Sequence, residues 1–294
     1  MNPISQNPYR ILGLKGNASA QEKQAAKNAI AAYLKVGSNP VLPFDNISNI
    51  ETISRNQEMV DLASNAILDD NDKIIHSIFW FIAGTLKDEL TINNLIEKND
   101  KEKAIEIFKS STENSEMDSS NYASFINYST LSMIGISDMS QLKEFISIKR
   151  KLSTNREVIS AIGTKLQLDV KNLRFSYISE EVLEKLIRLI KSLFPAKDEF
   201  ELLNYFFSND NTVLENGYKK LIQKLNQAVA ETEEKRTKYF ESLKHESVKL
   251  IQKCNKIGEK LLRDAEPILT DIKRFYGPSH MQTQNVNRQH KVDR

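Results

Sequence analysis

The four histidines of the chain are the residues best suited to metal binding or acid–base chemistry, and their spacing supports neither. They are His76, His245, His280 and His290. A zinc site typically uses histidines one helical turn apart or a nearby pair of thiols. The two closest histidines stand ten residues apart, and the chain has a single cysteine. The sequence therefore predicts no metal site and no cofactor.

An acidic cluster and the lone thiol are the other groups that could do chemistry. Asp69, Asp70 and Asp72 lie close together, but the glycine and the distal glutamate of a calcium-binding loop are missing. These carboxylates are better explained as the start of a helix. Cys254 falls among regularly spaced apolar residues and is expected to be a small buried side chain. Since no phosphate-binding glycine loop, nucleophile elbow or dinucleotide fingerprint occurs, we expect that the protein is not an enzyme.

The composition favours a helical, soluble protein. The chain has 294 residues, of which 40% are hydrophobic and 27% charged, with 9 glycines and 7 prolines. Length alone suggests about two domains. The formal net charge of +2 indicates neither nucleic acid nor an anionic membrane as a partner. No apolar run approaches the ~20 residues of a membrane-spanning helix. One cysteine and the absence of a signal-peptide pattern favour a cytoplasmic location.

Although few of its residues could do chemistry, the chain has clear helical patterns. The patterns near the N-terminus are the best defined. Residues 8–14 fit a short helix with a proline near its start. Ser19 followed by Glu22 is the capping box of a second helix. We expect its apolar face to be formed by Ala25, Ala29, Ala32 and Tyr33.

A loop and two further helices complete this N-terminal region. Residues 37–56, which include two prolines, predict a loop. The next helix begins near Asn56 and carries a buried stripe at helical spacing. Its members are Met59, Leu62, Ala63, Ala66 and Ile67. A fourth helix begins near Asp70, continues through Phe81 and can end at Gly84.

The remainder of the chain also predicts helices. Residues 101–108 and 122–131 have helical patterns, and residues 181–194 form a third that Pro195 stops. From 212 to 276 apolar residues recur at steps of three and four, as in a long helix or a helical hairpin with coiled-coil character. Pro267 should kink or break it. Residues 278–294 have few apolar side chains and predict a mobile tail.

The order of landmarks in residues 7–82 resembles the J-domain of DnaJ-like co-chaperones. The resemblance is carried by Pro8-Tyr9-Arg10-Ile11-Leu12-Gly13, the Ser19 cap, the Ala-rich second helix, and Ala66-Ile67-Leu68-Asp69-Asp70 followed by Asn71-Asp72-Lys73. Residues 102–108 and 122–131 are in turn similar to tetratricopeptide-repeat helices, although three units at a period of about 34 residues are not found.

The resemblance implies a contact with a seventy-kilodalton heat-shock chaperone. In that family a basic second helix and a following His-Pro-Asp tripeptide engage the chaperone and trigger its ATP hydrolysis. The matching positions here are Lys35, Val36 and Gly37, so the tripeptide is absent and the chain is a degenerate member. Lys23, Lys27 and Lys35 are the candidate chaperone contacts, although such lysines also fit an ordinary solvated helix face.

A partner helix is the other binding partner that the sequence indicates. Leu221, Leu225, Leu243 and Leu250 are the candidates for helix pairing, through which a second copy of the chain could also associate. Residues 219–275 contain 14 Lys or Arg against 9 Asp or Glu. Nucleic-acid binding would need these charges in a one-sided stripe, and i, i+4 ion pairs along the helix explain many of them.

The predicted architecture is all-α. It has a J-like head at 1–84, a helical, weakly repeat-like region at 85–210, a long kinked helix or hairpin at 211–276 and a tail at 277–294. The favoured function is a non-enzymatic adaptor related to co-chaperones. A genuine co-chaperone that stimulates a chaperone ATPase and a nucleic-acid-binding helical protein are the alternatives that stay open.

Overall fold

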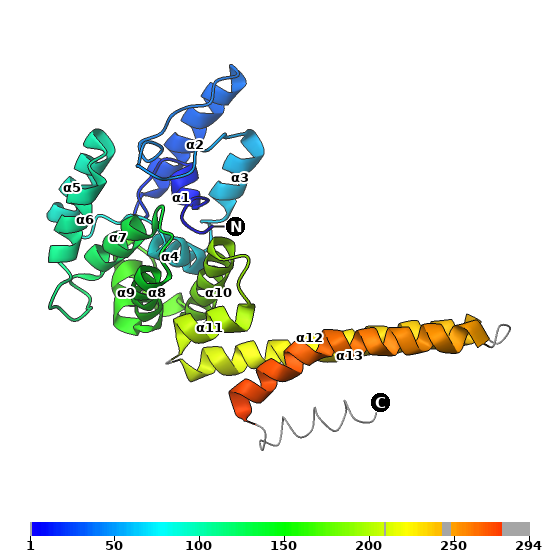
Figure 1. Ribbon diagram of the computed structural model, residues 1–294. Helices are drawn as coiled ribbons and strands as arrows, with labels where there is room; N and C mark the ends of the chain where they lie inside the picture. The colour runs from blue at the N-terminus through cyan, green and yellow to red at the C-terminus, as the bar shows by residue number, and fades with distance from the viewer. Residues whose placement is uncertain (1, 209, 243–247, 278–294) are drawn as a thin grey trace. The chain divides into compact units, whose positions relative to one another are not determined.

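The computed structural model describes residues 2–208, 210–242 and 248–277, and every regular element in these ranges is a helix (Figure 1). The predicted all-α class is confirmed. The chain divides into two compact units, Met1–Lys197 and Asp198–Arg294. The first unit holds both the expected head, 1–84, and most of the region expected to follow it.

Three helices open the first unit, and their caps follow the sequence closely. They are α1 (Pro8–Ile11), α2 (Ala20–Lys35) and α3 (Gln57–Asn65). The capping box of α2 is present, with Ser19 Oγ accepting from Glu22 N–H and the Glu22 carboxylate accepting from Ser19 N–H. Such a cap contributes about 1 kcal/mol to helix stability.

Helices α2 and α3 run antiparallel. Lys27 on α2 pairs with Asp61 on α3 at 2.7 Å. Beyond the end of α2, the Asn39 amide donates to the carbonyl of Ile53, just before α3, at 3.0 Å. The end of one helix therefore meets the start of the other, and residues 36–56 form the loop between them.

The face that α2 buries differs from the predicted one. Ile30 is its one fully buried residue, whereas Ala25, Ala29 and Ala32 are exposed and Tyr33 is 53% exposed. Leu62, expected in the buried stripe of α3, is also exposed. Alanine is favoured in helices without being buried, so an alanine pattern indicates a helix but not its inner face.

Helix α4 (Asp70–Ile78) begins as the acidic cluster predicts. The Asp69 carboxylate accepts from the backbone N–H of Asn71 at 2.9 Å and caps the helix. The predicted continuation through Phe81 to Gly84 is wrong, because α4 ends at Ile78. From there the chain runs through the core without regular structure.

Side chains from two other helices replace the hydrogen bond that would have continued α4. In a longer helix the Ile78 carbonyl would accept from Ile82 N–H. Instead the carbonyl accepts from Lys149 Nζ at 2.6 Å, and Ile82 N–H donates to Asn127 Oδ1 at 2.9 Å. The Asn127 amide also donates to the Ile82 carbonyl at 2.8 Å, so one asparagine satisfies both polar groups of a buried residue.

The core segment, residues 79–83, is the most deeply buried part of the first unit. Phe79, Trp80, Phe81 and Ile82 are all fully buried. Trp80 packs edge-on against Phe81 and against Phe44, at ring-centroid distances of 5.1 and 5.2 Å. Its indole N–H donates to the Leu14 carbonyl at 2.8 Å, and the Phe81 carbonyl accepts from Gly16 N–H at 2.7 Å. The segment thereby ties the turn after α1 to the helices behind it.

The helices that support the core segment follow it in the sequence. They are α5 (Leu86–Lys98), α6 (Lys101–Ser110), α7 (Tyr122–Met133), α8 (Met139–Thr154), α9 (Arg156–Lys165), the 3₁₀ helix η1 (Val170–Asn172) and α10 (Phe175–Leu193). Each helix from α5 to α8 packs against the next helix in the sequence. Helix α4 packs against α8, α9 and α10. Helix α10 begins six residues before the predicted start at 181 and, as expected, ends before Pro195.

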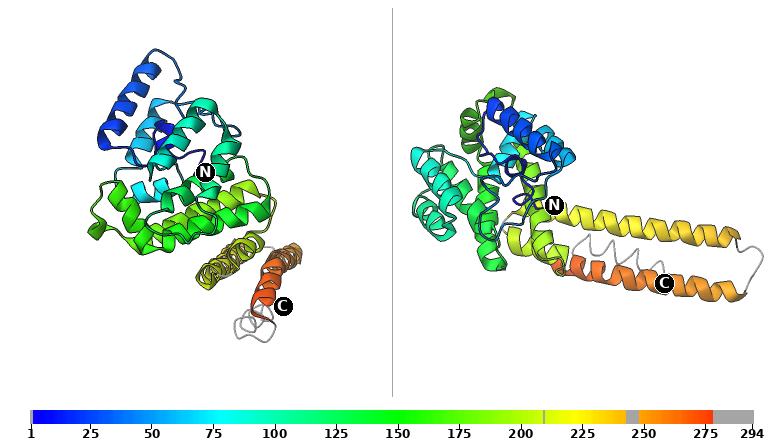
Figure 2. Two further views of the ribbon diagram at one scale, coloured as in Figure 1. Left: turned by 90° about the vertical axis from the view of Figure 1, so that its left-hand side faces the viewer. Right: turned by 90° about the horizontal axis from the view of Figure 1, so that it is seen from above.

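The second unit contains α11 (Glu199–Phe207) and an antiparallel hairpin of α12 (Asn211–Ser242) and α13 (Val248–Tyr276) (Figure 2). Ala265, Leu269 and Ile272 of α13 are buried, with Ile222 and Val229 of α12 packed against them. Of the two predicted forms, the hairpin is the one observed. Pro267 lies inside α13 and does not break it.

Several expectations fall on residues outside the described set. Leu243 lies in the undescribed stretch 243–247, and the side chains of Leu221, Leu225 and Leu250 are not described within their helices. The expected tail from 278 to 294 is also outside it. The pairing candidates therefore stay predictions.

Replacing Asn127 with alanine should destabilise the first unit strongly. The Asn127→Ala change leaves the buried N–H and carbonyl of Ile82 without partners, and each such group costs about 1–3 kcal/mol. We expect the free energy of unfolding, measured by urea titration, to fall by about 2–4 kcal/mol. Asn94→Ala is the control, because the Asn94 amide donates to the Leu90 carbonyl from an exposed position. Equal losses in the two variants would contradict the role assigned to Asn127.

Candidate functional site

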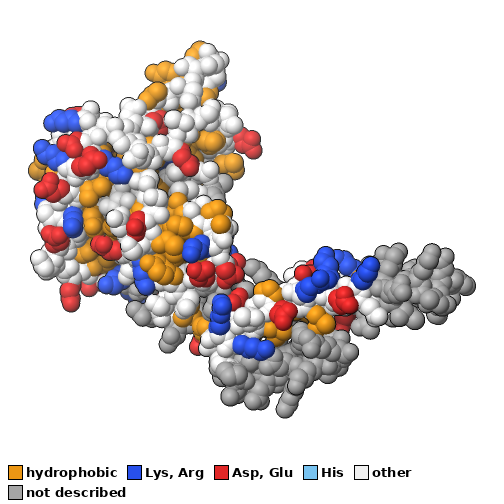
Figure 3. All heavy atoms as spheres, in the orientation of Figure 1, with side chains coloured by type: hydrophobic (Ala, Val, Ile, Leu, Met, Phe, Trp, Pro, Cys, Tyr) orange, Lys and Arg blue, Asp and Glu red, His pale blue; other side chains and the backbone are white. Residues whose placement is uncertain are grey.

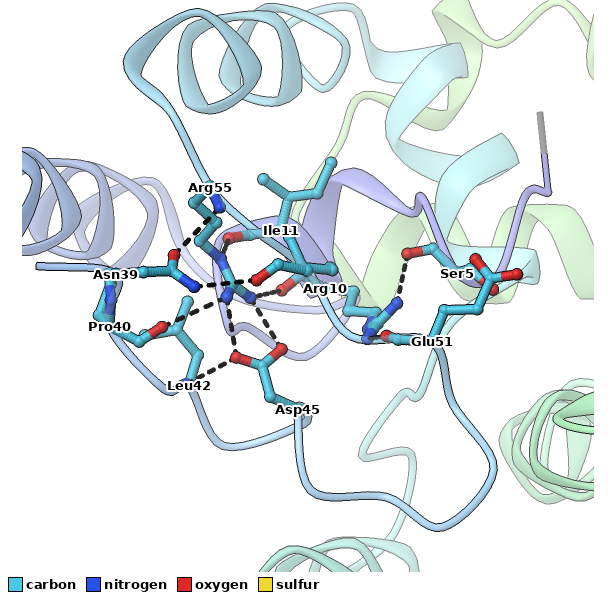
Figure 4. A network of polar contacts seen from close by, with 10 residues as sticks. Ser5, Arg10, Ile11, Asn39, Pro40, Leu42, Asp45, Glu51 and Arg55 are labelled. Atoms are coloured by element: carbon cyan, nitrogen blue, oxygen red, sulfur yellow. Dashed lines mark hydrogen bonds and ion pairs between the residues drawn. The ribbon is translucent and has the colours of Figure 1, made fainter.

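The loop between α2 and α3 is held in place by a buried arginine. Arg55 is almost fully buried and forms a two-pronged ion pair with Asp45, at 2.8 Å from Nη1 to Oδ2 and 2.9 Å from Nη2 to Oδ1 (Figure 4). This parallel geometry is the strongest that a guanidinium and a carboxylate can form. Asp45 also accepts from Leu42 N–H at 2.8 Å. The pair therefore closes the loop on itself.

The same guanidinium fastens the loop to α1. Arg55 Nε donates to the Ile11 carbonyl at 2.7 Å, and Nη2 donates to the Arg10 carbonyl at 3.2 Å. The Ile11 carbonyl lies at the end of α1, where no helical partner remains for it, whereas the Arg10 carbonyl also accepts from Gly13 N–H at 2.9 Å. Arg55 thus serves as the C-terminal cap of α1 and as the anchor of the loop.

A second buried arginine pins the loop from the opposite side of α1. Arg10 is fully buried and donates to the carbonyls of Ser5 and Glu51 (Figure 4). Burial lowers the pKa of Arg10 to about 10, although the Asp45 charge acts in the opposite direction. The second half of the loop is consequently fixed to α1 at Glu51 and at Arg55 through charged side chains.

The fixed loop presents apolar side chains at the end of α2. We call Tyr33, Val36 and Val41 the α2 tip. Their exposed fractions are 53%, 79% and 73%. Gly37 ends the helix with a φ of +73°, a conformation that glycine adopts without strain. Hydrophobic side chains at this end of α2 are visible in Figure 3.

The predicted contact lysines do not form one cluster. Lys23 and Lys27 line a groove beside the first half of α2, with a volume of about 1140 Å³. Lys35 is exposed in the last turn of α2 and is not part of the groove lining. Since a helix rises 1.5 Å per residue, Lys35 lies roughly 18 Å along the axis from Lys23. The groove instead adds Lys73 and Lys165, which sequence analysis did not select.

The described residues hold neither a metal-binding cluster nor a membrane-spanning helix. Among them no three His, Cys, Asp or Glu side chains gather closely enough to hold a metal ion. Nor does any helix within these ranges combine the length and apolar character required to cross a bilayer.

The comparisons with known proteins leave the site to be interpreted from its own geometry. No protein-family model, curated protein or solved structure matches this chain. The likeness to a J-domain therefore stays a resemblance of sequence landmarks.

Sequence reasoning missed the residues that position the tip. Arg55 and Asp45 are single charges in a loop rich in Asn, Ser and Pro, and nothing in their spacing marks them as partners. The useful signal was indirect. A 20-residue stretch such as 37–56 without regular structure is uncommon inside a compact domain, so a fixing interaction was to be expected.

Removing the carboxylate of Asp45 should destabilise the first unit. The Asp45→Ala change leaves the buried Arg55 charge without its counter-ion, which typically costs about 3–5 kcal/mol. We expect the free energy of unfolding, measured by urea titration, to fall by about 3 kcal/mol. Asp61→Ala is the matched control, because its ion pair with Lys27 is exposed to solvent, where ion pairs contribute little to stability. Equal effects would show that Arg55 is not an anchor.

Proposed function

We propose that this protein is a non-enzymatic adaptor, related to J-domain co-chaperones, that binds another protein through the α2 tip. The observation that carries the proposal is the exposure of Tyr33, Val36 and Val41, which fall close together in the sequence at the end of α2 and in the loop that follows it. Large exposed apolar side chains that gather at one place are typical of protein-interaction surfaces.

The anchoring of the loop supports the proposal. A contact surface that is already ordered loses less conformational entropy on binding, so more of the interaction energy appears as affinity. Here the Arg55–Asp45 pair and the Arg10 hydrogen bonds hold residues 39–55 against α1. Val41 of the tip therefore lies in an anchored segment, and Tyr33 and Val36 lie at the end of α2 just before it.

The resemblance to J-domains indicates which part of the surface would contact the partner. In J-domains the turn after the second helix carries the tripeptide that acts on the chaperone, and the corresponding residues here are Lys35, Val36 and Gly37. The antiparallel arrangement of α2 and α3 supports the comparison. An apolar turn at this place is suited to docking and lacks the aspartate that would pair with a chaperone arginine.

The proposal predicts that polar substitutions at the tip abolish partner binding. With Val36→Ser and Val41→Ser combined, we expect partner recovery in quantitative affinity purification from source-cell extract to fall about tenfold, the equivalent of 1.4 kcal/mol. Leu86→Ser with Leu90→Ser is the control, because these two leucines are also large exposed apolar residues, on α5. A partner lost only from the α5 variant would place the contact elsewhere.

The co-chaperone alternative has its own test. We expect that the wild-type chain, added to a seventy-kilodalton heat-shock chaperone, leaves its steady-state ATPase rate unchanged, because the tripeptide is missing. A DnaJ-like protein with an intact tripeptide is the positive control. A rate increase that is lost in the Val36→Ser, Val41→Ser variant would replace the adaptor assignment with that of a genuine co-chaperone.

A further inference from the structure

The groove beside α2 is a surface distinct from the α2 tip. Its walls come from the first half of α2, from the end of α3 through Lys73, and from the end of α9 through Leu168. These segments lie far apart in the sequence but belong to the first unit. At about 1140 Å³ the groove exceeds the roughly 300–1,000 Å³ of small-molecule pockets, so it has room for a chain segment.

The lining of the groove is strongly basic, although the chain as a whole is nearly neutral. Lys23, Lys27, Lys73 and Lys165 line it, and Glu22 is the one acidic residue among the lining residues. Lys27 and Lys73 have carboxylate partners, Asp61 at 2.7 Å and Asp70 at 2.6 Å. Lys23 and Lys165 are therefore the lysines of the lining that could meet a negatively charged ligand.

Lys23 and Lys165 have no carboxylate partner in the described part of the chain. Lys165 Nζ donates to the Gly84 carbonyl at 3.3 Å. Lys23 Nζ lies 5.5 Å from the ring centroid of Tyr9, over its face. Burial, and then repulsion from Lys73, lower the pKa of Lys23. Asp70, which pairs with Lys73, and Glu22 act on the pKa of Lys23 in the opposite direction.

Apolar side chains accompany the lysines. Leu68 is 70% exposed at the edge of the groove, and Leu166 and Leu168 are half-buried in its opposite wall. Tyr122 and Ile67 are buried beneath them. A ligand that fills the groove would therefore bury apolar area while its negative charges meet the lysines.

This combination favours a peptide over a nucleic acid. Single-stranded nucleic acids are held by exposed aromatic rings on which bases stack. Tyr122 is the one aromatic residue in the lining, and it is 6% exposed. Acidic and apolar side chains, by contrast, match both features of the lining. We propose that this groove binds a protein segment that combines acidic and apolar side chains.

The proposal is tested by peptide selection on the full chain. A library of random 12-residue peptides displayed on phage should yield binders enriched in Asp, Glu and large apolar residues. Measured by fluorescence anisotropy, the dissociation constant of a selected peptide should rise at least tenfold for the Lys23→Gln, Lys165→Gln variant. The matched control is Lys35→Gln with Lys98→Gln, which removes two exposed lysines outside the groove lining and changes the net charge equally. Its affinity should change less than twofold.

A second variant tests the apolar half of the site. Leu68→Ser alters an exposed residue and should preserve the fold, as circular dichroism can verify, but should weaken peptide binding severalfold. Selected peptides that are neutral or basic, or equal losses in the groove and control variants, would overturn the proposal. Tighter binding of a 12-nucleotide oligo-dT or of inorganic pyrophosphate than of any selected peptide would assign the groove to another class of anion. None of these results depends on the α2 tip.

Discussion

The burial of the core segment, residues 79–83, is the constraint on which the first unit depends. Four consecutive large side chains are fully buried, so their peptide groups are removed from water as well. Buried peptide groups outside a helix or sheet need partners from elsewhere in the molecule. Asn127, Gly16 and Asn17 supply them, and Lys149 bonds the carbonyl of Ile78 directly before the segment. These residues come from α7, α8 and the turn before α2, so satisfying one short segment fixes three parts of the chain together.

Two of the buried basic residues, Arg55 and Lys149, offset the cost of their desolvation in different ways. Arg55 keeps a carboxylate partner and can remain charged in a buried place. Lys149 has three neutral acceptors, the carbonyls of Ile78 and Ile126 and the hydroxyl of Thr130. Burial lowers the pKa of Lys149 well below its ordinary value. The arginine therefore secures a surface loop, whereas the lysine replaces a missing helical hydrogen bond deep in the core.

Several helix starts could be predicted from local signals, whereas the packing of the helices against one another could not. Ser19 was predicted as a cap, and helix starts were predicted near Asn56 and Asp70, because the capping side chains Ser19, Asn56 and Asp69 act within three residues of themselves. The end of α4 was misplaced because Lys149 and Asn127 stop it from 71 and 45 residues away. The candidate site likewise contains residues that the local sequence indicates and residues that only the fold brings to it. Lys23 and Lys27 share a helix and were found together, but Lys73 and Lys165 join them only through the fold.

Helix α2 explains why one element can offer two binding surfaces. A helix that buries a single residue, Ile30, gains little from packing and must be stabilised locally. Its capping box and its alanines provide that stability without using its sides. The flank that carries Lys23 and Lys27 remains open to the groove, and the far end presents the α2 tip. The alanine pattern that failed to indicate a buried face therefore describes a helix kept exposed. Both proposed surfaces require such a helix.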